Sequence, residues 1–159
     1  MIELLLTMAL LSVIGMLFIS YTGDVGNVAV DAASYKIQSD IRYAQQLATS
    51  TGTPHGIQFI KNGNYTVYRD TLENPISDPL DKQPMIKDME GFGDVAINIT
   101  LNVKFDKAGK PIEGGGQSVE IVSPSGAARR IYIIDNTGSV VVDVLGYSDS
   151  CSCRVCIQE

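Results

Sequence analysis

The sequence contains few residues that could support catalysis. Its 159 residues include a single histidine, no tryptophan and three cysteines, and the cysteines are confined to segment 151–159. It has no glycine-rich phosphate-binding motif. These scarcities leave no set of side chains for nucleophilic catalysis or phosphoryl transfer, so the sequence predicts a non-enzymatic protein without a cofactor.

Basic residues are outnumbered by acidic ones. The sequence has 12 lysines and arginines and 18 aspartates and glutamates, which gives a net charge of -6. Seven of the acidic residues and only two lysines lie in segment 70–94, so the negative charge is concentrated there. Nothing in this balance favours binding to a polyanion through bulk electrostatics.

The sequence does have a long apolar run at its start. Residues 4–21 carry no charge, and a helix of this length reaches roughly across the hydrocarbon core of a membrane. A cleaved signal peptide would need a basic first region, a shorter apolar core and a small-residue cleavage site, and none of these is visible. The run therefore predicts a membrane-spanning helix. Glu3 stands at its start, and a carboxylate in such a segment usually faces a partner.

A second, amphipathic helix is predicted after an interruption at residues 22–27, which contain two helix-weakening glycines. Gly52 is expected to end this helix. Lys36 and Asp40 are spaced for an i,i+4 ion pair. Apolar residues recur along the helix at spacings of three and four: Val30, Ala33, Ile37, Ile41, Ala44 and Ala48. Such a stripe predicts packing against a sheet.

The hydrophobic period changes from 3.6 to 2 beyond residue 54, which predicts strands. Residues 56–59 and 65–68 flank an Asn-Gly pair, which is a strong hairpin signal. Residues 95–105 alternate like a half-buried strand with a bend or bulge midway. Three further strands are expected at 119–122, 130–134 and 140–144. Turn-forming residues separate them, so the sheets should be largely antiparallel.

Together these patterns predict an α+β fold. A long N-terminal helix, apolar in its first half and amphipathic in its second, should pack on an antiparallel β domain. The expected parts are a transmembrane helix over residues 1–24, its amphipathic continuation over 25–52, a β domain over 53–145 and a cysteine-containing tail over 146–159. A fragment that begins at Val28 should be soluble, folded and monomeric.

Several segments resemble a known class of proteins. The start "IELLL", followed by an apolar helix, resembles type IV pilins and type II secretion pseudopilins. Residues 39–59, which include "DIRYAQQLATSTGTPHGIQF", resemble the helix end and first strand of the FimT and GspH family of minor pilins and pseudopilins. The runs "VKFDKAG", "QSVEIVSPSGAARRIYI" and "DNTGSVVV" resemble that family's Phe-x-x-x-Gly turn and final glycine-rich hairpins. The resemblance covers about residues 1–145 and implies a pilin-like fold.

The resemblance also implies a function. The chain would be a minor pilin or pseudopilin, a membrane-inserted subunit of a type IV pilus or a type II secretion pseudopilus. Glu3 occupies the position of the family's N-terminal glutamate, which is thought to meet the amine of a neighbouring subunit's first residue. The implied partners are other pilin or pseudopilin subunits and the inner-membrane assembly platform. The helix over residues 1–24 would form the filament core. The chain would cross the bacterial inner membrane once, with its C-terminal domain in the periplasm or on an extracellular filament.

The sequence departs from the family at its start and in its acidic segment. We expect the chain to depart from the short basic leader that the prepilin peptidase cuts, and to begin about two residues after the usual mature start. Asp70, Glu73, Asp78 and Asp81 could supply oxygen ligands for Ca²⁺, but their spacing is irregular, so a solvated loop is expected instead.

The tail is the third departure. It contains Cys151, Cys153 and Cys156, and haem attachment is excluded because Ile157 rather than histidine follows the last of them. A zinc site would need a fourth ligand, and His55 is expected to be an ordinary surface residue at the start of the first strand. We expect one intramolecular disulfide to Cys156, with one thiol left over. Three free thiols, a shared metal or an intersubunit bond are the alternatives.

Two functions of other classes remain open. A DNA-binding minor pilin, as some FimT-like subunits are proposed to be, would need a basic patch. Arg129 and Arg130 are adjacent, however, and would point to opposite faces of a strand. A membrane-anchored metal or redox module would instead use the cysteine tail. Nucleic acid is therefore not expected to be the main partner.

Overall fold

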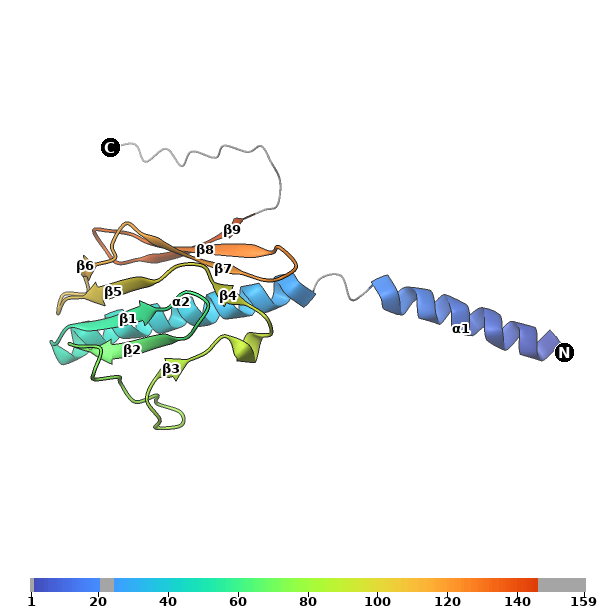
Figure 1. Ribbon diagram of the computed structural model, residues 1–159, viewed down its shortest axis with the longest axis horizontal. Helices are drawn as coiled ribbons and strands as arrows, with labels where there is room; N and C mark the ends of the chain where they lie inside the picture. The colour runs from blue at the N-terminus through green and yellow to red at the C-terminus, as the bar shows by residue number, and fades with distance from the viewer. Residues whose placement is uncertain (1, 21–24, 146–159) are drawn as a thin grey trace.

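The computed structural model describes residues 2–20 and 25–145 (Figure 1). Its helices are α1 (Ile2–Ser20), α2 (Val25–Thr51) and the short 3-10 helix η2 (Glu90–Phe92). Its strands are β1 (His55–Phe59), β2 (Tyr65–Arg69), β3 (Ile86–Lys87), β4 (Ala96–Ile97), β5 (Leu101–Phe105), β6 (Pro111–Glu113), β7 (Ser118–Val122), β8 (Ala128–Ile133) and β9 (Val140–Leu145). The two α-helices thus precede the strands, as predicted, and η2 lies between β3 and β4.

Helix α1 lies apart from the other elements in Figure 1. Six of its large apolar side chains are between 50% and 68% exposed, namely Leu6, Met8, Leu10, Leu11, Val13 and Ile14. Within residues 2–20 and 25–145, no helix combines the length and the apolar character that crossing a membrane requires.

Helix α2 carries the predicted apolar stripe, and all six of its members are fully buried. The helix begins at Val25, so Gly26 belongs to it rather than to the predicted interruption. This glycine packs so closely against the β7–β8 turn that an added Cβ would collide with the Ser125 side chain. Gly52 ends the helix as predicted, in a left-handed conformation with φ +66° that glycine adopts without strain.

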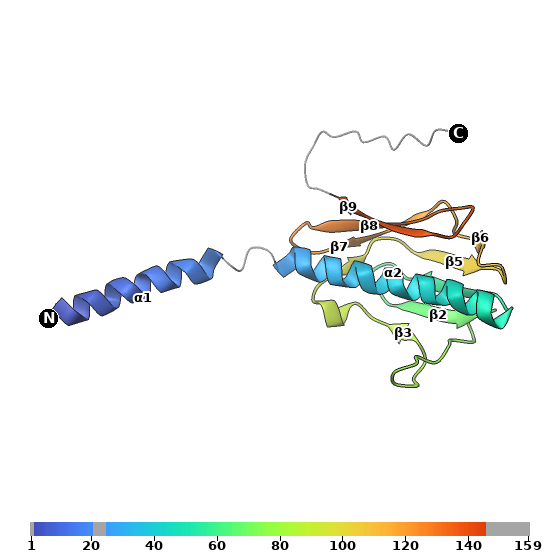
Figure 2. The same ribbon diagram turned by 180° about the vertical axis from the view of Figure 1, so that it is seen from behind.

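The strands form two antiparallel sheets, as predicted. One has the order β3-β2-β1-β5-β6 and the other the order β4-β7-β8-β9. The predicted hairpin is present, because β1 pairs with β2 from Phe59 opposite Tyr65 onward. Helix α2 contacts strands of both sheets and lies across them (Figure 2). Its buried stripe therefore joins the inner faces of the two sheets into one core.

The predicted strand over residues 95–105 is divided between the two sheets. Strand β4 pairs with β7, whereas β5 pairs with β1. The alternation of buried residues is interrupted at Ile99, which is 41% exposed. The backbone N–H of Asn98 still bonds to Glu120, but Thr100 turns to accept a hydrogen bond from the N–H of Lys61. The predicted bend is thus a change of sheet.

Gln45 of α2 connects the helix to two turns of the β domain. Its Nε2 donates hydrogen bonds to the carbonyl oxygens of Gly109 at 2.8 Å and Thr137 at 2.9 Å. Gly109 closes the Phe-x-x-x-Gly turn after β5, with φ +79°. In the second turn, a Cβ on Gly138 would lie 2.7 Å from the same nitrogen. Both turns therefore need glycine for close approach as well as for backbone conformation.

Candidate functional site

Glu3 is the acidic residue of the first turn of α1, and its side chain is exposed. A negative charge at this end of a helix is favoured by the unpaired N–H groups and the helix dipole. Within the described residues Glu3 forms no ion pair. The first turn therefore presents a carboxylate beside an exposed apolar helix surface. Such a surface can pack against another helix that brings a positive charge.

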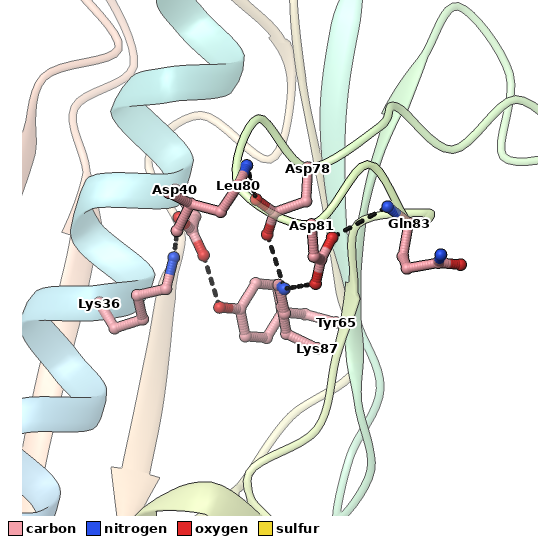
Figure 3. A network of polar contacts seen from close by, with 8 residues as sticks. All are labelled: Lys36, Asp40, Tyr65, Asp78, Leu80, Asp81, Gln83 and Lys87. Carbon is pink, nitrogen blue, oxygen red and sulfur yellow. Dashed lines mark hydrogen bonds and ion pairs between the residues drawn. The ribbon is translucent and has the colours of Figure 1, made fainter.

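A buried polar network connects α2 to β2 (Figure 3). Asp40 is 3% exposed, and it accepts hydrogen bonds from Lys36 Nζ at 2.7 Å and from the Tyr65 hydroxyl at 2.6 Å. The predicted Lys36–Asp40 pair is thus confirmed. Burial raises the pKa of the Tyr65 phenol far above its ordinary value, and the Asp40 carboxylate raises it further. The phenol therefore remains a hydrogen-bond donor to Asp40 even in alkaline solution.

Asp78 connects the acidic segment to β3. Asp78 is 4% exposed as a residue, and its carboxylate accepts hydrogen bonds from Lys87 Nζ at 2.6 Å and from the N–H of Leu80 at 2.8 Å (Figure 3). Hydrogen bonding to Lys87 holds the pKa of Asp78 below its ordinary value, and the same bond raises the pKa of Lys87. The expectation of a solvated loop is therefore wrong at Asp78.

The other acidic residues considered as Ca²⁺ ligands do not gather around Asp78. Asp81 lies 3.8 Å from Lys87 Nζ, whereas Asp70 lies 3.9 Å from Lys104 Nζ. Glu73 is exposed. Among the described residues, no group of three or more histidine, cysteine, aspartate or glutamate side chains is arranged to hold a metal ion.

The two adjacent arginines of β8 point to opposite faces, as predicted. Arg129 is 8% exposed, and its Nε donates to Asp31 of α2 at 2.6 Å. Arg130 donates from Nε and from its terminal nitrogen to Glu120 of β7, at 3.1 and 2.6 Å. Hydrogen bonding to Arg130 lowers the pKa of Glu120. Both guanidinium groups are thus engaged by carboxylates, which reduces what they can offer to phosphates.

His55 is buried, and the expectation that it is a surface residue is wrong. It is 2% exposed, and its Nδ1 lies 2.9 Å from the carbonyl oxygen of Thr53. It shares the inward face of β1 with Ile57 and Phe59, since residues two apart in a strand point the same way. Its place on the core face follows from this alternation. The predicted cysteine sites, Cys151, Cys153 and Cys156, lie outside the described residues.

Sequence reasoning missed that Tyr65 bonds to Asp40. A signal was present, because Asp40 lies three residues beyond Ile37 and four before Ala44, on the buried side of α2. A charged residue at such a position requires a polar partner inside the protein. The identity of the partner depends on which strand passes the helix there, and this is set by the sheet order.

No protein-family model and no curated protein matches this chain. Two solved structures that resemble it are crystal forms of the type IV minor pilin FimU of Pseudomonas aeruginosa. The first has a TM-score of 0.52 at 14% sequence identity, covering 71% of this chain and 91% of FimU. The second has a TM-score of 0.53 at 15% identity, covering 72% of this chain and 87% of FimU. The chain therefore has a pilin-like fold.

Proposed function

We propose that this chain is a non-enzymatic minor subunit of a type IV pilus that assembles through its N-terminal helix. The proposal rests on one observation: an exposed apolar helix headed by Glu3 precedes a β domain of pilin-like fold. FimU, whose structures this fold resembles, is a type IV minor pilin.

The exposed side chains of α1 support assembly on energetic grounds. Fully burying one Leu, Met or Val side chain contributes about 1.5–3 kcal/mol. Six such side chains, each at least half exposed, would together contribute several kcal/mol once neighbouring helices cover them. In this role α1 packs among the helices of other pilin subunits, and the β domain lies at the filament surface.

Before assembly, the same helix would lie in the bacterial inner membrane, with the β domain on the periplasmic side. The support for this step is in the sequence, because residues 4–21 carry no charge and continue beyond the end of α1. The inner-membrane assembly platform would then be the partner that receives the subunit.

Glu3 would select the position of the subunit in the filament. A carboxylate among apolar helices is costly unless a positive charge meets it, so each added subunit is favoured where its Glu3 meets an amine of a neighbour. A hydrogen bond to a charged group contributes about 1.5–3 kcal/mol, and 1.4 kcal/mol corresponds to about a tenfold change in an equilibrium constant.

The experiment compares Glu3→Ala with Ser12→Ala in a cell that assembles the pilus. Ser12 lies on the same helix, but its hydroxyl bonds to the carbonyl oxygen of Ala9 at 2.8 Å, so it needs no partner from outside. We expect Glu3→Ala to enter the membrane normally and to fall about tenfold in sheared filaments, and Ser12→Ala to behave like the wild type. Equal recovery of all three proteins from filaments would show that Glu3 has no such role.

A further inference from the structure

A pocket of about 560 Å³ lies at the end of α2, beside the first residue of β1 and the last residue of β2. Tyr43, Leu47 and Thr51 line it from the helix, since residues four apart lie on the same side of a helix. Residues 73–77, which follow β2 in the chain, line it as well. The volume of this pocket is within the range of small-molecule sites in proteins.

Backbone pairing fixes the shape of this pocket. His55 of β1 pairs directly with Arg69 of β2, and residues that lie opposite each other share a face of the sheet. The N–H of Arg69 donates to the carbonyl oxygen of Asn74 at 2.9 Å, and the N–H of Ile76 donates to the carbonyl oxygen of Val67 at 3.0 Å. The segment after β2 is therefore hydrogen-bonded to that strand, which makes the pocket largely preformed.

His55 offers the pocket a hydrogen-bond acceptor. Its Nδ1 lies 2.9 Å from the carbonyl oxygen of Thr53. A carbonyl oxygen cannot donate, so Nδ1 carries a proton and Nε2 of the neutral ring is an acceptor. Among the described residues, every fully buried side-chain nitrogen and oxygen has a hydrogen-bond partner, whereas this Nε2 has none. Although His55 is buried, its Nε2 is therefore accessible, and the space that reaches it is the pocket that His55 lines.

Two opposite charges line the pocket without pairing with each other. Arg69 and Glu73 are both exposed, and in the part of the chain that the structure describes neither side chain forms an ion pair or a hydrogen bond. A guanidinium group binds a carboxylate through two parallel hydrogen bonds, and a carboxylate binds an ammonium group. Tyr43, Leu47 and Ile76 are half-buried and add apolar surface. The pocket thus combines a cation, an anion, a neutral acceptor and an apolar wall.

We propose that this pocket binds a free α-amino acid with an apolar side chain. Arg69 binds its carboxylate, and Glu73 and Nε2 of His55 accept hydrogen bonds from its ammonium group. Its side chain packs on the apolar surface from α2. The chain has a net charge of -6 that is concentrated in segment 70–94, which repels an anion, whereas an amino acid has no net charge. A simple cation would leave Arg69 without a partner.

The test uses 15N NMR of the full chain in detergent micelles, without a histidine tag. His55 is the only histidine of the sequence, so its two ring nitrogens are identified directly. The probe is L-leucine. Leucine amide lacks the carboxylate, and N-acetyl-leucine lacks the ammonium group. We expect leucine to shift the Nε2 signal of His55 saturably, and each analogue to bind at least about tenfold more weakly, because it leaves one charge of the pocket unpaired.

Variants of the two exposed charges connect each group of the ligand to its partner. Arg69→Gln should weaken leucine binding by about tenfold or more but leave leucine amide unchanged to within about twofold. Glu73→Gln should weaken leucine binding to a similar extent and leave N-acetyl-leucine unchanged. Lys107→Gln is the control, because it removes an exposed positive charge that does not line the pocket, and it should bind leucine like the wild type.

Three results would overturn the proposal. The first is the absence of a saturable shift at His55 with tens of millimolar leucine, and the second is equal binding of leucine and its two analogues. The third is leucine binding that neither Arg69→Gln nor Glu73→Gln weakens, which would show that the amino acid binds elsewhere. None of these measurements requires a filament, so the proposal can fail while the proposed function stands.

Discussion

The hydrogen bond from Tyr65 to Asp40 is expected to be a measurable source of stability. Tyr65→Phe removes the hydroxyl and leaves one carboxylate oxygen of Asp40, a residue that is 3% exposed, without its donor. A hydrogen bond to a charged group contributes about 1.5–3 kcal/mol, and an unpaired buried acceptor costs a similar amount. We therefore expect Tyr65→Phe to lower the free energy of unfolding by about 2 kcal/mol.

The assay is urea denaturation of a fragment that begins at Val25, where α2 begins and where Gly26 is retained against the β7–β8 turn. At a slope of about 1.5 kcal/mol per molar urea, the midpoint should fall by roughly 1.3 M with the slope unchanged. Tyr35→Phe is the control, because the Tyr35 side chain is 63% exposed, and it should cost less than about 0.5 kcal/mol. A loss in Tyr65→Phe as small as that in the control would refute the reasoning.

Three further predictions concern turns, pH and nucleic acid. Gly138→Ala should lower the free energy of unfolding, measured by urea denaturation, by about 2 kcal/mol or more. The reason is that Gly138 has φ +68° and that an added Cβ would lie within 3.0 Å of two side chains and a backbone oxygen. Gly52→Ala is the control and should cost only about 1 kcal/mol, because Gly52 has φ +66° but nothing lies within 4 Å of an added Cβ. Above pH 10 or so, the phenol of Tyr65 ionises in the unfolded chain but stays neutral in the fold, since its pKa is raised there, so stability falls as the pH rises; denaturation curves of Tyr65→Phe should show a shallower fall than the wild type, and equal slopes would contradict the assignment. Gel shifts at physiological salt should give duplex DNA affinities weaker than about 10 µM, whereas submicromolar binding with a steep salt dependence would favour the DNA-binding alternative.

Local patterns were sufficient for most of the fold. The stripe on α2 was predictable because a helix that packs on one side repeats its apolar residues every three or four positions. The β1–β2 hairpin was predictable because an Asn-Gly pair lies between its two strands. In the structure Asn62 has φ 54°, a conformation that asparagine tolerates well. The strands β7, β8 and β9 follow one another in the chain and are separated by turn residues, so their antiparallel pairing needed no distant information.

Features that depend on distant partners were not predictable in the same way. The change of sheet between β4 and β5 could be predicted only by knowing that β4 pairs with β7 and that β5 pairs with β1. The burial of Asp78 depends on Lys87, a residue that only the path of the acidic segment brings near. The position of His55 was different, because the alternation with Ile57 and Phe59 already placed it on the core face. The burial of His55 could therefore have been predicted from the sequence, and the prediction of a surface position was wrong.

The most direct test of the proposed function is to locate α1 inside an assembled filament. A photo-crosslinking amino acid at Leu11, which is 68% exposed on α1, would be introduced into the full chain in a cell that assembles the pilus. We expect sheared filaments to contain the chain crosslinked at this position to the N-terminal helices of neighbouring pilin subunits, as identified by mass spectrometry. Filaments that lack the chain, or that contain it without any crosslink from Leu11 to a pilin helix, would contradict the proposal.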